Sequence, residues 1–427
     1  MNINPLIRIG SLMDRPEESP MLVSGEGGYL LDSNGKRLLD LCGGIWNIPF
    51  GYKNSYINQK IIRQMEELPF CNLISNVAEV QYRYAERLTG LLHMPAVLFT
   101  CSGSEAVEAA VKACRQYQAL KGSAKKEIAA FNLSYHGTSY GAMSVSGIDR
   151  EVTGVFGPLL EEISWVETPH SIYDTERWHR AVEELFERRA DRLAGFIVEP
   201  VIASGGVIEI PPEILHYIER LCRENDVLLI MDEVSTGFGR TGVPFVFREQ
   251  ELSPDLVCLS KGITNGYMPL GVLAFSGRVA GQYAETGAVF EHFSSQSGNL
   301  AAIAAADAVL DLMEHYEDYE VEKKGQVFRK TLRSELQDFQ GIDIRGRGLM
   351  SGISFHEKTG GGTLGKLLGQ LRRRGVLPYY FYNPGYNIGL SFFPPFILTE
   401  EELTKAARII AAQIRKHPDI MRGNSFI

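Results

Sequence analysis

The chain lacks several features that mark whole classes of protein. It has 427 residues but only six cysteines, and no two of them form a CxxC pair. Its nine histidines form no HxH or HxxxH pair, so no metal site is indicated. Basic residues are fewer than acidic ones, 43 against 52, and the net charge is −9. Because nucleic-acid binding needs a clustered basic surface, we expect no nucleic-acid partner.

Long hydrophobic runs are also absent. No stretch of about 18 uncharged apolar residues is present, so we expect no membrane-spanning helix and no membrane partner. The first 20 residues hold prolines and charges where a signal peptide needs an apolar core. The scattered cysteines are typical of reduced thiols, which favours a cytoplasmic protein. The remaining composition, 44% hydrophobic and 22% charged, is that of an ordinary globular chain with two or three domains.

The middle of the chain alternates short apolar runs with amphipathic segments. Runs of β-branched and leucine residues predict strands buried on both faces, as in a parallel sheet between helices. The predicted strands are 96–101, 195–201, 227–234, 255–262 and 269–277, and the predicted helices are 104–120 and 212–225. Residues 21–41 predict a hairpin sheet with Asn34-Gly35 as its turn. In such parallel sheets, ligands bind at the carboxyl ends of the strands.

One of these strand ends leads directly into a helix. Ser102, with Glu105 three residues later, forms a capping-box pattern. The free amides of Gly103 and Ser104 would point out of the helix N-terminus, which is a favourable place for an anion. The alternative is an ordinary capped helix without a ligand.

Two other strand ends carry charged residues. Asp232 ends a buried strand, where a carboxylate is costly unless it meets a positive partner, and a structural salt bridge is one alternative. Lys261 directly follows an apolar strand; a desolvated lysine has a lowered pKa and becomes an amine nucleophile, although many such lysines only extend their amine to solvent. Residues 237–242 match the dinucleotide fingerprint, but Pro244 and an apolar run follow where a helix should begin, so we reject that match.

A different class of enzyme is represented by one further motif. Residues 137–141 match GxSxG, which would make Ser139 the nucleophile of a serine hydrolase with His292 as a histidine partner. Three fixed positions are easily matched by chance in a chain with 43 glycines. We keep the hydrolase as the alternative from another class.

Taken in order, the motifs resemble one family. SGSEAVEAA (102–110), YHG (135–137), VEP (198–200), MDEVSTGFGRTG (231–242), PDLVCLSKG (254–262) and SQSGN (295–299) follow one another as in the class III aminotransferases. These are fold type I enzymes that use pyridoxal 5′-phosphate (PLP), and the resemblance runs from about residue 20 to 405. GGIWNIPFGYKN (43–54) is similar to the ω-amine branch of that family.

The resemblance implies a fold and a division of the chain. The expected fold is α/β, with a mostly parallel sheet between helices in a large domain and a smaller α+β domain built from both chain ends. Residues 1–54 would form the N-terminal part of the small domain, 55–325 the large PLP-binding domain, and 326–427 the C-terminal part of the small domain.

The resemblance also assigns cofactor-binding residues. Lys261 would hold PLP as an internal aldimine, and Asp232 would pair with the pyridinium nitrogen. The remaining contacts to the ring and phosphate would come from Ser102, Gly103, Ser104, Tyr135, His136, Glu199, Val234 and Ser295. Ser295 would reach the phosphate of the partner subunit, which implies a homodimer. The reaction would be a ping-pong transfer of an amino group between an amine or amino acid and a carbonyl acceptor.

The substrate side departs from the family pattern. Many relatives carry an arginine three residues before the Pro-Pro pair, where this chain has Ser391, and residues 375–407 contain no arginine at all. Carboxylate recognition favours the guanidinium fork, so we expect a large or non-α-carboxylate substrate, such as an amine, an aldehyde or ketone, or a carrier- or peptide-bound group. Trp46, Tyr135, Arg240 and Tyr380 would line the pocket. An aminomutase, racemase or decarboxylase of the same fold would share Lys261 and Asp232 and stays an alternative.

Overall fold

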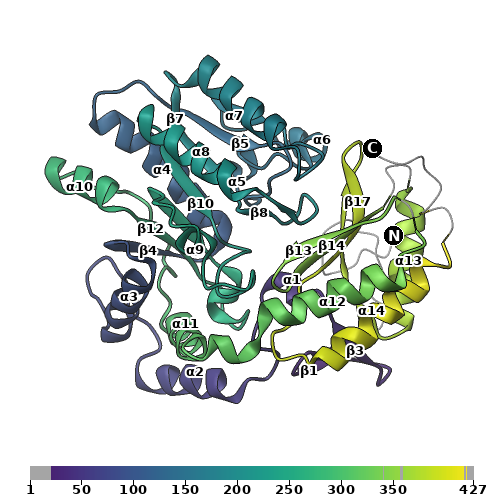
Figure 1. The fold of residues 1–427 in the computed structure, drawn as a ribbon. Helices are drawn as coiled ribbons and strands as arrows, with labels where there is room; N and C mark the ends of the chain where they lie inside the picture. Colours follow the sequence, from purple (N-terminus) through teal and green to yellow (C-terminus); the bar gives the residue numbers. More distant parts are fainter. Residues whose placement is uncertain (1–20, 340, 356–358, 418–419, 421–427) are drawn as a thin grey trace, which may run out of the picture.

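A seven-stranded sheet forms the centre of the computed structural model, which describes residues 21–339, 341–355, 359–417 and 420 (Figure 1). In spatial order the strands are β4 (Ala96–Thr100), β12 (Gly271–Phe275), β11 (Leu256–Leu259), β10 (Leu228–Asp232), β7 (Leu193–Val198), β5 (Glu127–Phe131) and β6 (Ile163–Val166). Only β12 runs antiparallel to its neighbours. The expected mostly parallel sheet is therefore confirmed.

Helices cover both faces of this sheet, because successive strand residues point to opposite sides. Leu228 and Ile230 of β10 belong to the apolar cluster that includes α4 (Gly103–Leu120). Leu229 and Met231 belong to the larger cluster that includes α8 (Pro212–Glu224) and α7 (Thr175–Arg189). The continuous apolar runs in the sequence thus reflect burial on two faces.

A second region lies beside the sheet, at the right of Figure 1, and combines both ends of the described chain. One antiparallel sheet has the order β13 (Asp343–Arg347), β14 (Met350–Phe355), β17 (Asn387–Phe392) and β16 (Tyr379–Asn383). Another has the order β1 (Leu22–Glu26), β2 (Tyr29–Asp32), β3 (Arg37–Asp40) and β15 (Val376–Leu377). The hairpin β2–β3 turns at Asn34-Gly35, as predicted, and Gly35 has a φ of +75°.

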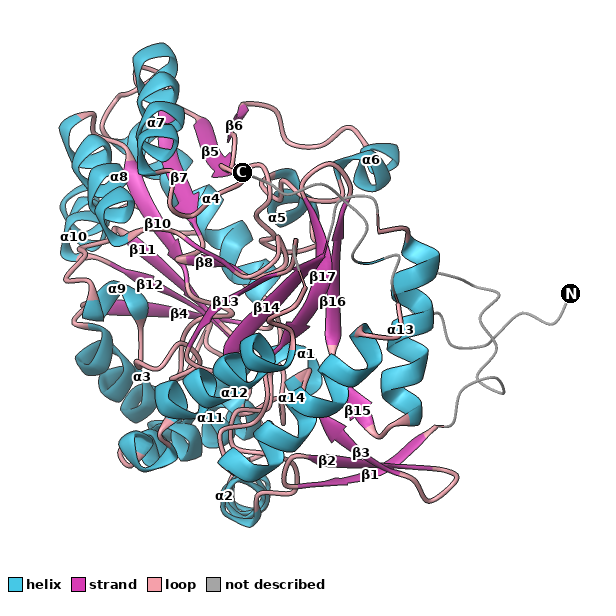
Figure 2. Ribbon diagram, turned by 45° about the vertical axis from the view of Figure 1, so that its right-hand side comes forward, coloured by secondary structure: helices cyan, strands magenta, loops and turns pink. Residues whose placement is uncertain are grey.

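The remaining elements connect and cover these sheets (Figure 2). The longer helices are α2 (Ser55–Glu67), α3 (Glu79–Leu92), α10 (Gly277–Thr286), α11 (Leu300–Met313), α12 (Val321–Glu335), α13 (Gly361–Arg373) and α14 (Glu400–Ile414). The short ones are α1 (Gly43–Trp46), α5 (Tyr140–Ser144), α6 (Arg150–Thr153), α9 (Val246–Glu249), η2 (Gly154–Phe156), η3 (Lys261–Thr264) and η4 (Tyr316–Tyr319), with a small ribbon of β8 (Val201–Ile202) and β9 (Ile208–Glu209). Among the described residues, none of the helices combines the length and apolarity needed to cross a membrane.

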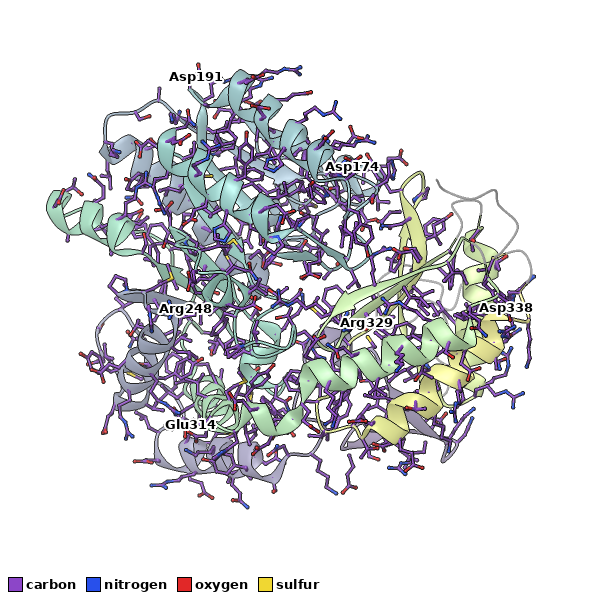
Figure 3. All side chains as sticks on the ribbon, in the orientation of Figure 1. Asp174, Asp191, Arg248, Glu314, Arg329 and Asp338 are labelled. Carbon is purple, nitrogen blue, oxygen red and sulfur yellow. The ribbon has the colours of Figure 1, made fainter. Side chains whose placement is uncertain are left out.

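Charged side chains lie mainly at the periphery of the molecule, as Asp174, Asp191 and Asp338 illustrate (Figure 3). Arg329 of α12 is a buried exception, and its Nη1 donates to the carbonyl oxygen of Gly348 at 2.6 Å. This contact attaches α12 to the turn between β13 and β14.

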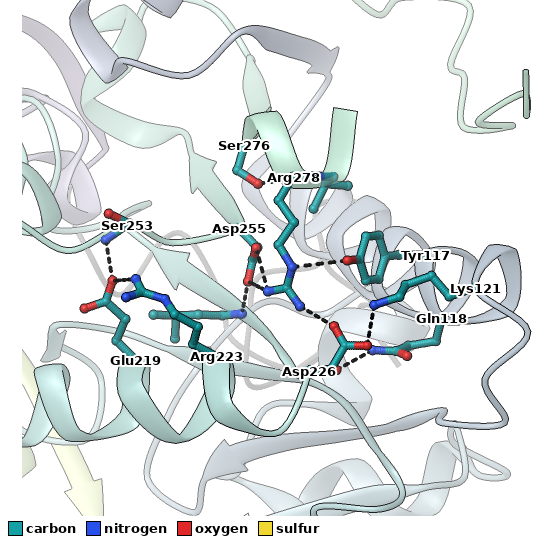
Figure 4. A network of polar contacts seen from close by, with 12 residues as sticks. Tyr117, Gln118, Lys121, Glu219, Arg223, Asp226, Ser253, Asp255, Ser276 and Arg278 are labelled. Carbon is teal, nitrogen blue, oxygen red and sulfur yellow. Dashed lines mark hydrogen bonds and ion pairs between the residues drawn. The ribbon is translucent and has the colours of Figure 1, made fainter. Parts of the chain in front are cut away.

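A polar network holds the amino ends of the central strands (Figure 4). Arg278, in the first turn of α10, donates to both carboxylate oxygens of Asp255 at 3.2 Å and also pairs with Asp226. Its Nε donates to the Tyr117 hydroxyl of α4 at 3.1 Å. Asp255 further accepts the amide N–H of Leu229 in β10 at 2.9 Å. The network therefore joins two helices to the starts of β10 and β11.

Candidate active site

The opposite, carboxyl ends of the strands carry the residues singled out by the sequence. Gly103 follows β4, His136 lies beyond β5, and Glu199 directly follows β7. Asp232 is the last residue of β10, and Lys261 lies two residues after β11. Because these strands all run in the same direction, their carboxyl ends meet at one edge of the sheet.

Asp232 has a histidine as its partner. Its Oδ2 lies 2.6 Å from Nδ1 of His136, and both side chains are buried. Its Oδ1 accepts the amide N–H of Val234 at 3.0 Å. The ring of His136 has a second nitrogen, Nε2, that is buried without a hydrogen-bond partner among the described residues. The sequence-based expectation that Asp232 needs a compensating partner is thus met by His136.

The amine of Lys261 lies in a pocket with a hydroxyl and an aromatic ring. Its Nζ donates to Oγ of Ser235 at 2.6 Å and lies 4.5 Å from the centroid of the Trp46 ring. No ion pair of Lys261 occurs within the part of the chain that the structure describes. Burial lowers the pKa of Lys261, while the charges of Asp232 and Glu199 act in the opposite direction. A lowered pKa increases the fraction of the neutral amine, which is the nucleophilic form.

Ser235 was missed by the sequence analysis. It lies three residues after Asp232, at the same strand end. A polar residue at that place is a signal that could have been used, because loops at these strand ends carry the ligands of such sheets.

Glu199 adds a second carboxyl group to the buried cluster. It accepts the amide N–H groups of Tyr135 at 3.0 Å and Ala203 at 3.2 Å. Burial raises the pKa of Glu199 to about 7, with the charge of His136 opposing and that of Asp232 reinforcing the rise.

The N-terminus of α4 presents free donors beside this cluster. Ser102 Oγ accepts the N–H of Glu105 at 3.2 Å, as predicted, but the Glu105 carboxylate accepts the N–H of Cys101 rather than that of Ser102. The capping box is therefore only half present, because the carboxylate reaches one residue further back. The amides of Gly103 and Ser104 have no acceptor among the described residues. These donors and the positive end of an 18-residue helix favour a phosphate group.

Close packing at this point leaves no room for additional side chains. A Cβ on Gly103 would lie 3.0 Å from Cγ1 of Val234, and a Cβ on Gly137 would lie 2.3 Å from Oγ of Ser104. Both glycines therefore let the backbone approach the donors at the helix N-terminus. With the Lys261 amine and the Asp232 carboxylate nearby, this donor set fits PLP, which needs an amine, an acid for its ring nitrogen and a phosphate site.

An apolar wall lies next to the Lys261 amine. The Trp46 ring stacks on Phe393 at a centroid distance of 4.4 Å and meets Tyr379 edge-on at 6.0 Å. Tyr135 is half-buried nearby, and burial raises its pKa. Tyr380 is 45% exposed, and its ring stacks on that of Tyr379. Tyr379 thus lies closer to Trp46 than the residue chosen from the sequence.

Arg240 lies away from solvent, among backbone carbonyls. Its Nη1 donates to the carbonyl of Pro394 at 2.6 Å and to that of Leu349 at 3.4 Å, and its guanidinium carbon lies 4.8 Å from the Phe396 ring. Burial lowers the pKa of Arg240 to about 9. In this arrangement the guanidinium supports the segment that carries Phe393, so a direct contact with substrate stays a prediction.

The segment that carries Trp46 has an unusual backbone. Gly43, Gly44, Ile45 and Trp46 have φ values of +57°, +59°, +57° and +69°, so α1 is a left-handed turn. Left-handed geometry costs about 1–2 kcal/mol for each residue other than glycine. The sequence analysis did not anticipate this turn. Strain of this kind is maintained only where the surroundings enforce it, and it clusters at functional sites.

Three other candidate residues lie elsewhere. Ser139 precedes α5, and its Oγ is buried without a hydrogen-bond partner among the described residues. His292 lies 3.6 Å from Glu105 and 3.4 Å from Lys112, so a Ser139–His292 pair is not formed. Ser295 is exposed, in a loop that Ser294 links to the Cys101 thiol at 3.3 Å.

The geometry of this site fits a PLP-binding enzyme of fold type I. Comparison with known proteins agrees. The profile of the family described as "Aminotransferase class-III" matches residues 13–414, and the chain belongs to this family. It is 33% identical to the acetylornithine aminotransferase of Caldanaerobacter subterraneus, over 93% of this chain and 96% of the relative. It is also 33% identical to the adenosylmethionine-8-amino-7-oxononanoate aminotransferase of Staphylococcus aureus, over 79% and 78%.

Solved structures show the same fold. An amine transaminase from an uncultivated Pseudomonas species, in its PLP-bound form, superposes with a TM-score of 0.88 at 30% identity, covering 97% of this chain and 99% of that one. An (S)-enantioselective omega-transaminase from Thermomicrobium roseum has the same TM-score and identity, covering 97% and 96%. The protein is therefore a PLP-dependent aminotransferase of fold type I. The isomerase, decarboxylase and hydrolase alternatives are not favoured.

Proposed function

We propose that this aminotransferase takes its amino group from a donor amine without an α-carboxylate and passes it to a carbonyl acceptor. One observation carries the proposal: Ser391, where many relatives have an arginine, is buried in β17 directly opposite Tyr379 of β16. Residues directly opposite on antiparallel strands point to the same face. An aromatic ring therefore occupies the face from which a guanidinium would reach a carboxylate.

The surroundings of Tyr379 support an apolar substituent. Its ring lies edge-on to Trp46, whose own ring lies beside the Lys261 amine. Phe393 and Met350 belong to the same buried cluster. Burial raises the pKa of Tyr379 to about 12, so its hydroxyl stays neutral at physiological pH. A wall of this composition favours an aryl or alkyl group over a carboxylate.

We propose the following roles around Lys261. When bound, PLP supplies an aromatic ring that withdraws electrons from the substrate carbon. Asp232, held by His136, keeps the proton on the ring nitrogen. The Lys261 amine would be the covalent attachment point for PLP, and it would move a proton at the substrate Cα as general base and acid. The amides of Gly103 and Ser104 hold the phosphate.

The remaining ring contacts are proposed on the same basis. Tyr135 and Val234 pack against the two ring faces, Ser102 caps the phosphate-binding helix, and Glu199 borders the cofactor through its bond to the Tyr135 amide.

A homodimer is part of the proposal. The segment between α2 and α3 and its flanks expose apolar side chains, with Ile74 72% and Val77 62% exposed. Gln81 ties this segment to the Ser295 loop, because its Nε2 donates to the Gly298 carbonyl at 2.8 Å and the Cys71 carbonyl at 3.4 Å. Exposed apolar patches mark protein interfaces. Sedimentation velocity should give a dimer for the wild type and a monomer for Ile74→Asp, and a monomeric wild type would remove this part of the proposal.

Two broader expectations are retained as proposals. The pairing of β3 with β15 supports a small domain made from 1–54 and 326–427 around the large domain 55–325, although residues 1–20 lie outside the described part. All six cysteines are free thiols, which supports a cytoplasmic location.

The substrate proposal is tested by comparing donors. We expect kcat/KM for 1-phenylethylamine to exceed that for N-acetylornithine and L-alanine by about tenfold or more, which corresponds to about 1.4 kcal/mol. Tyr379→Arg should narrow this ratio by placing a guanidinium opposite Ser391. Tyr380→Arg, one residue along on the exposed face, is the matched control. Preference for the carboxylated donors in the wild type would overturn the proposal.

A further inference from the structure

We infer that Asp40 is a positioning residue for Trp46: it fixes the left-handed turn Gly43–Trp46 and so sets the pocket wall beside Lys261. The inference deepens the proposed function, because it rests on Trp46 lining the substrate pocket. Asp40 is the last residue of β3, in the small sheet of β1, β2, β3 and β15.

The carboxylate of Asp40 gathers the amide groups at the start of the turn. Its Oδ1 accepts the N–H of Cys42 at 2.9 Å and that of Gly43 at 3.0 Å. Its Oδ2 accepts the N–H of Gly44 at 2.8 Å and the hydroxyl of Tyr52 at 2.6 Å. The side chain is buried, and its charge also acts on the guanidinium of the buried Arg240. Three successive amides directed at one carboxylate impose the local chain direction.

The rest of the turn is held by neighbouring side chains. Cys42 Sγ accepts the N–H of Ile45 at 3.3 Å, and Asn47 Nδ2 donates to the carbonyls of Gly44 at 2.9 Å and Ile45 at 2.7 Å. A Cβ on Gly43 would lie 2.3 Å from the Phe393 carbonyl oxygen. Only a glycine fits there, and it lets the turn lie directly against the strand end that carries Phe393.

The backbone of the turn determines where the Trp46 ring lies. Its φ of +69° aims a bulky residue in a direction that an ordinary loop does not give. The ring is pressed onto Phe393, and its face lies 4.5 Å from the Lys261 amine. Trp46 is thus a direct contact between the turn that Asp40 holds and the Lys261 amine.

A double-mutant cycle tests this route. Asp40→Asn keeps the size of the side chain but replaces the Oδ2 acceptor by an NH₂ group, so the Gly44 amide loses its partner. We expect kcat/KM for the amine donor to fall about tenfold, mainly through KM. In a Trp46→Ala background, the same substitution should change kcat/KM by less than about twofold, since coupled residues are non-additive.

A matched control separates positioning from stability. Asp32 is also a buried aspartate at a strand end of the same sheet, and its Oδ1 accepts the amides of Asn34 at 3.0 Å and Lys36 at 2.9 Å. Asp32→Asn should lower Tm without changing KM. In the cofactor-free protein, the near-UV circular dichroism of Asp40→Asn should lose the band that Trp46→Ala loses, and Asp32→Asn should keep it.

Each outcome decides the matter. Equal losses for Asp40→Asn in both backgrounds, or the same KM change in Asp32→Asn, would overturn the inference. If Trp46→Ala itself leaves donor kinetics unchanged, the proposed pocket fails; if it alters them and Asp40→Asn does not, only the inference fails. Should Asp40→Asn not fold, Tyr52→Phe takes its place in the double-mutant cycle with Trp46→Ala. This variant removes a single donor to Oδ2, so the expected loss of kcat/KM is smaller.

Discussion

The two ends of the central sheet differ in how far their polar groups are paired within the protein. At the amino ends, Arg278 and Asp255 have each other and further polar partners (Figure 4). At the carboxyl ends, Lys261 has no ion pair within the described residues, and the Nε2 atom of His136 is buried without a partner. The amides of Gly103 and Ser104 also lack an acceptor in the described part of the chain.

This difference shows how one set of strands serves two purposes. Buried polar groups are nearly always hydrogen-bonded, so a cluster of unmet groups needs a reason. The amino-end contacts stabilise the junction of sheet and helices. We propose that the cofactor and substrate supply the partners of the carboxyl-end groups that have none among the described residues. Stability and activity should therefore separate when the two ends are changed in turn.

The largest expected effect concerns activity. Lys261→Ala should lower kcat by at least about 10³-fold and abolish the visible absorbance that borohydride fixes, because the attachment point is lost. The free energy of unfolding of the cofactor-free protein should change by no more than about 1 kcal/mol, since burial already disfavours the charged amine. Lys125→Ala is the control: burial lowers the pKa of Lys125 too, but it lies near Asp226 at the amino ends. A loss of activity in that variant would contradict the comparison.

The next effect should be structural. Arg278→Met removes the partner of the buried Asp255 and should cost about 3 kcal/mol in unfolding free energy, with kcat unchanged. Burial raises the pKa of Asp255 and Arg278 lowers it, so in the variant the carboxyl takes up a proton at higher pH. The cost should shrink as the pH falls. Arg223→Ala, which removes an exposed arginine paired with Glu219, should cost less than about 0.5 kcal/mol, and chemical denaturation measures both variants.

A pH experiment sharpens the comparison within the carboxyl end. Burial raises the pKa of Glu199 and of Glu233 to about 7, above the unfolded value near 4.5. The folded state holds the extra proton in this window, so stability falls as pH rises from about 4.5 to 7. Glu199→Gln and Glu233→Gln should each reduce this fall in the free energy of unfolding, between pH 4.5 and 7, by about 1–3 kcal/mol.

Only one of these two variants should affect the cofactor. Glu199 lies beside His136, whereas Glu233 accepts from Thr236 and the amide of Phe247. Glu199→Gln should therefore shift the pH dependence of the visible absorbance, and Glu233→Gln should leave it unchanged. An equal shift in both would show that the spectrum reports general loosening of the fold.

The smallest effect concerns the strained turn. Ile45 is 48% exposed and has a φ of +57°, which a β-branched residue tolerates poorly. Ile45→Asn should raise the unfolding free energy by up to about 1 kcal/mol, because asparagine accepts this conformation more readily. Val23→Asn, an exposed change in β1, should give no such gain. A destabilised Ile45→Asn would mean that the isoleucine side chain is itself needed.

The fold was largely predictable because its signals are local. The strand that ends in Asp232 and the strand before Lys261 are continuous apolar runs, and a residue at such an end has few possible surroundings. The helix after Ser102 begins where the capping pattern places it. The family motifs then assigned chemistry to positions that the sheet brings together.

The remaining features depend on contacts between residues that are distant in the sequence, which local patterns do not indicate. Tyr379 and Tyr380 are equally aromatic, and only the register of β16 against β17 decides which one faces Trp46. The left-handed turn conflicts with the local preferences of Ile45 and Trp46 and is imposed by Asp40, Cys42 and Asn47. The carbonyls that bind Arg240 come from distant segments, which no local pattern around residue 240 indicates.

The reversed direction of β12 has a consequence for Lys261. Because β11 and β12 form a hairpin, the ten residues from Lys261 to Leu270 make a short closed loop, and Oγ of Ser260 donates to the Leu270 carbonyl at 2.7 Å across its base. The backbone of Lys261 is thus fixed, and its amine can move only as far as the four-carbon side chain allows. Well-oriented tethered groups react as though present at about 10⁵–10⁸ M. In the proposed reaction, a Lys261 amine released from the cofactor would therefore remain beside the substrate.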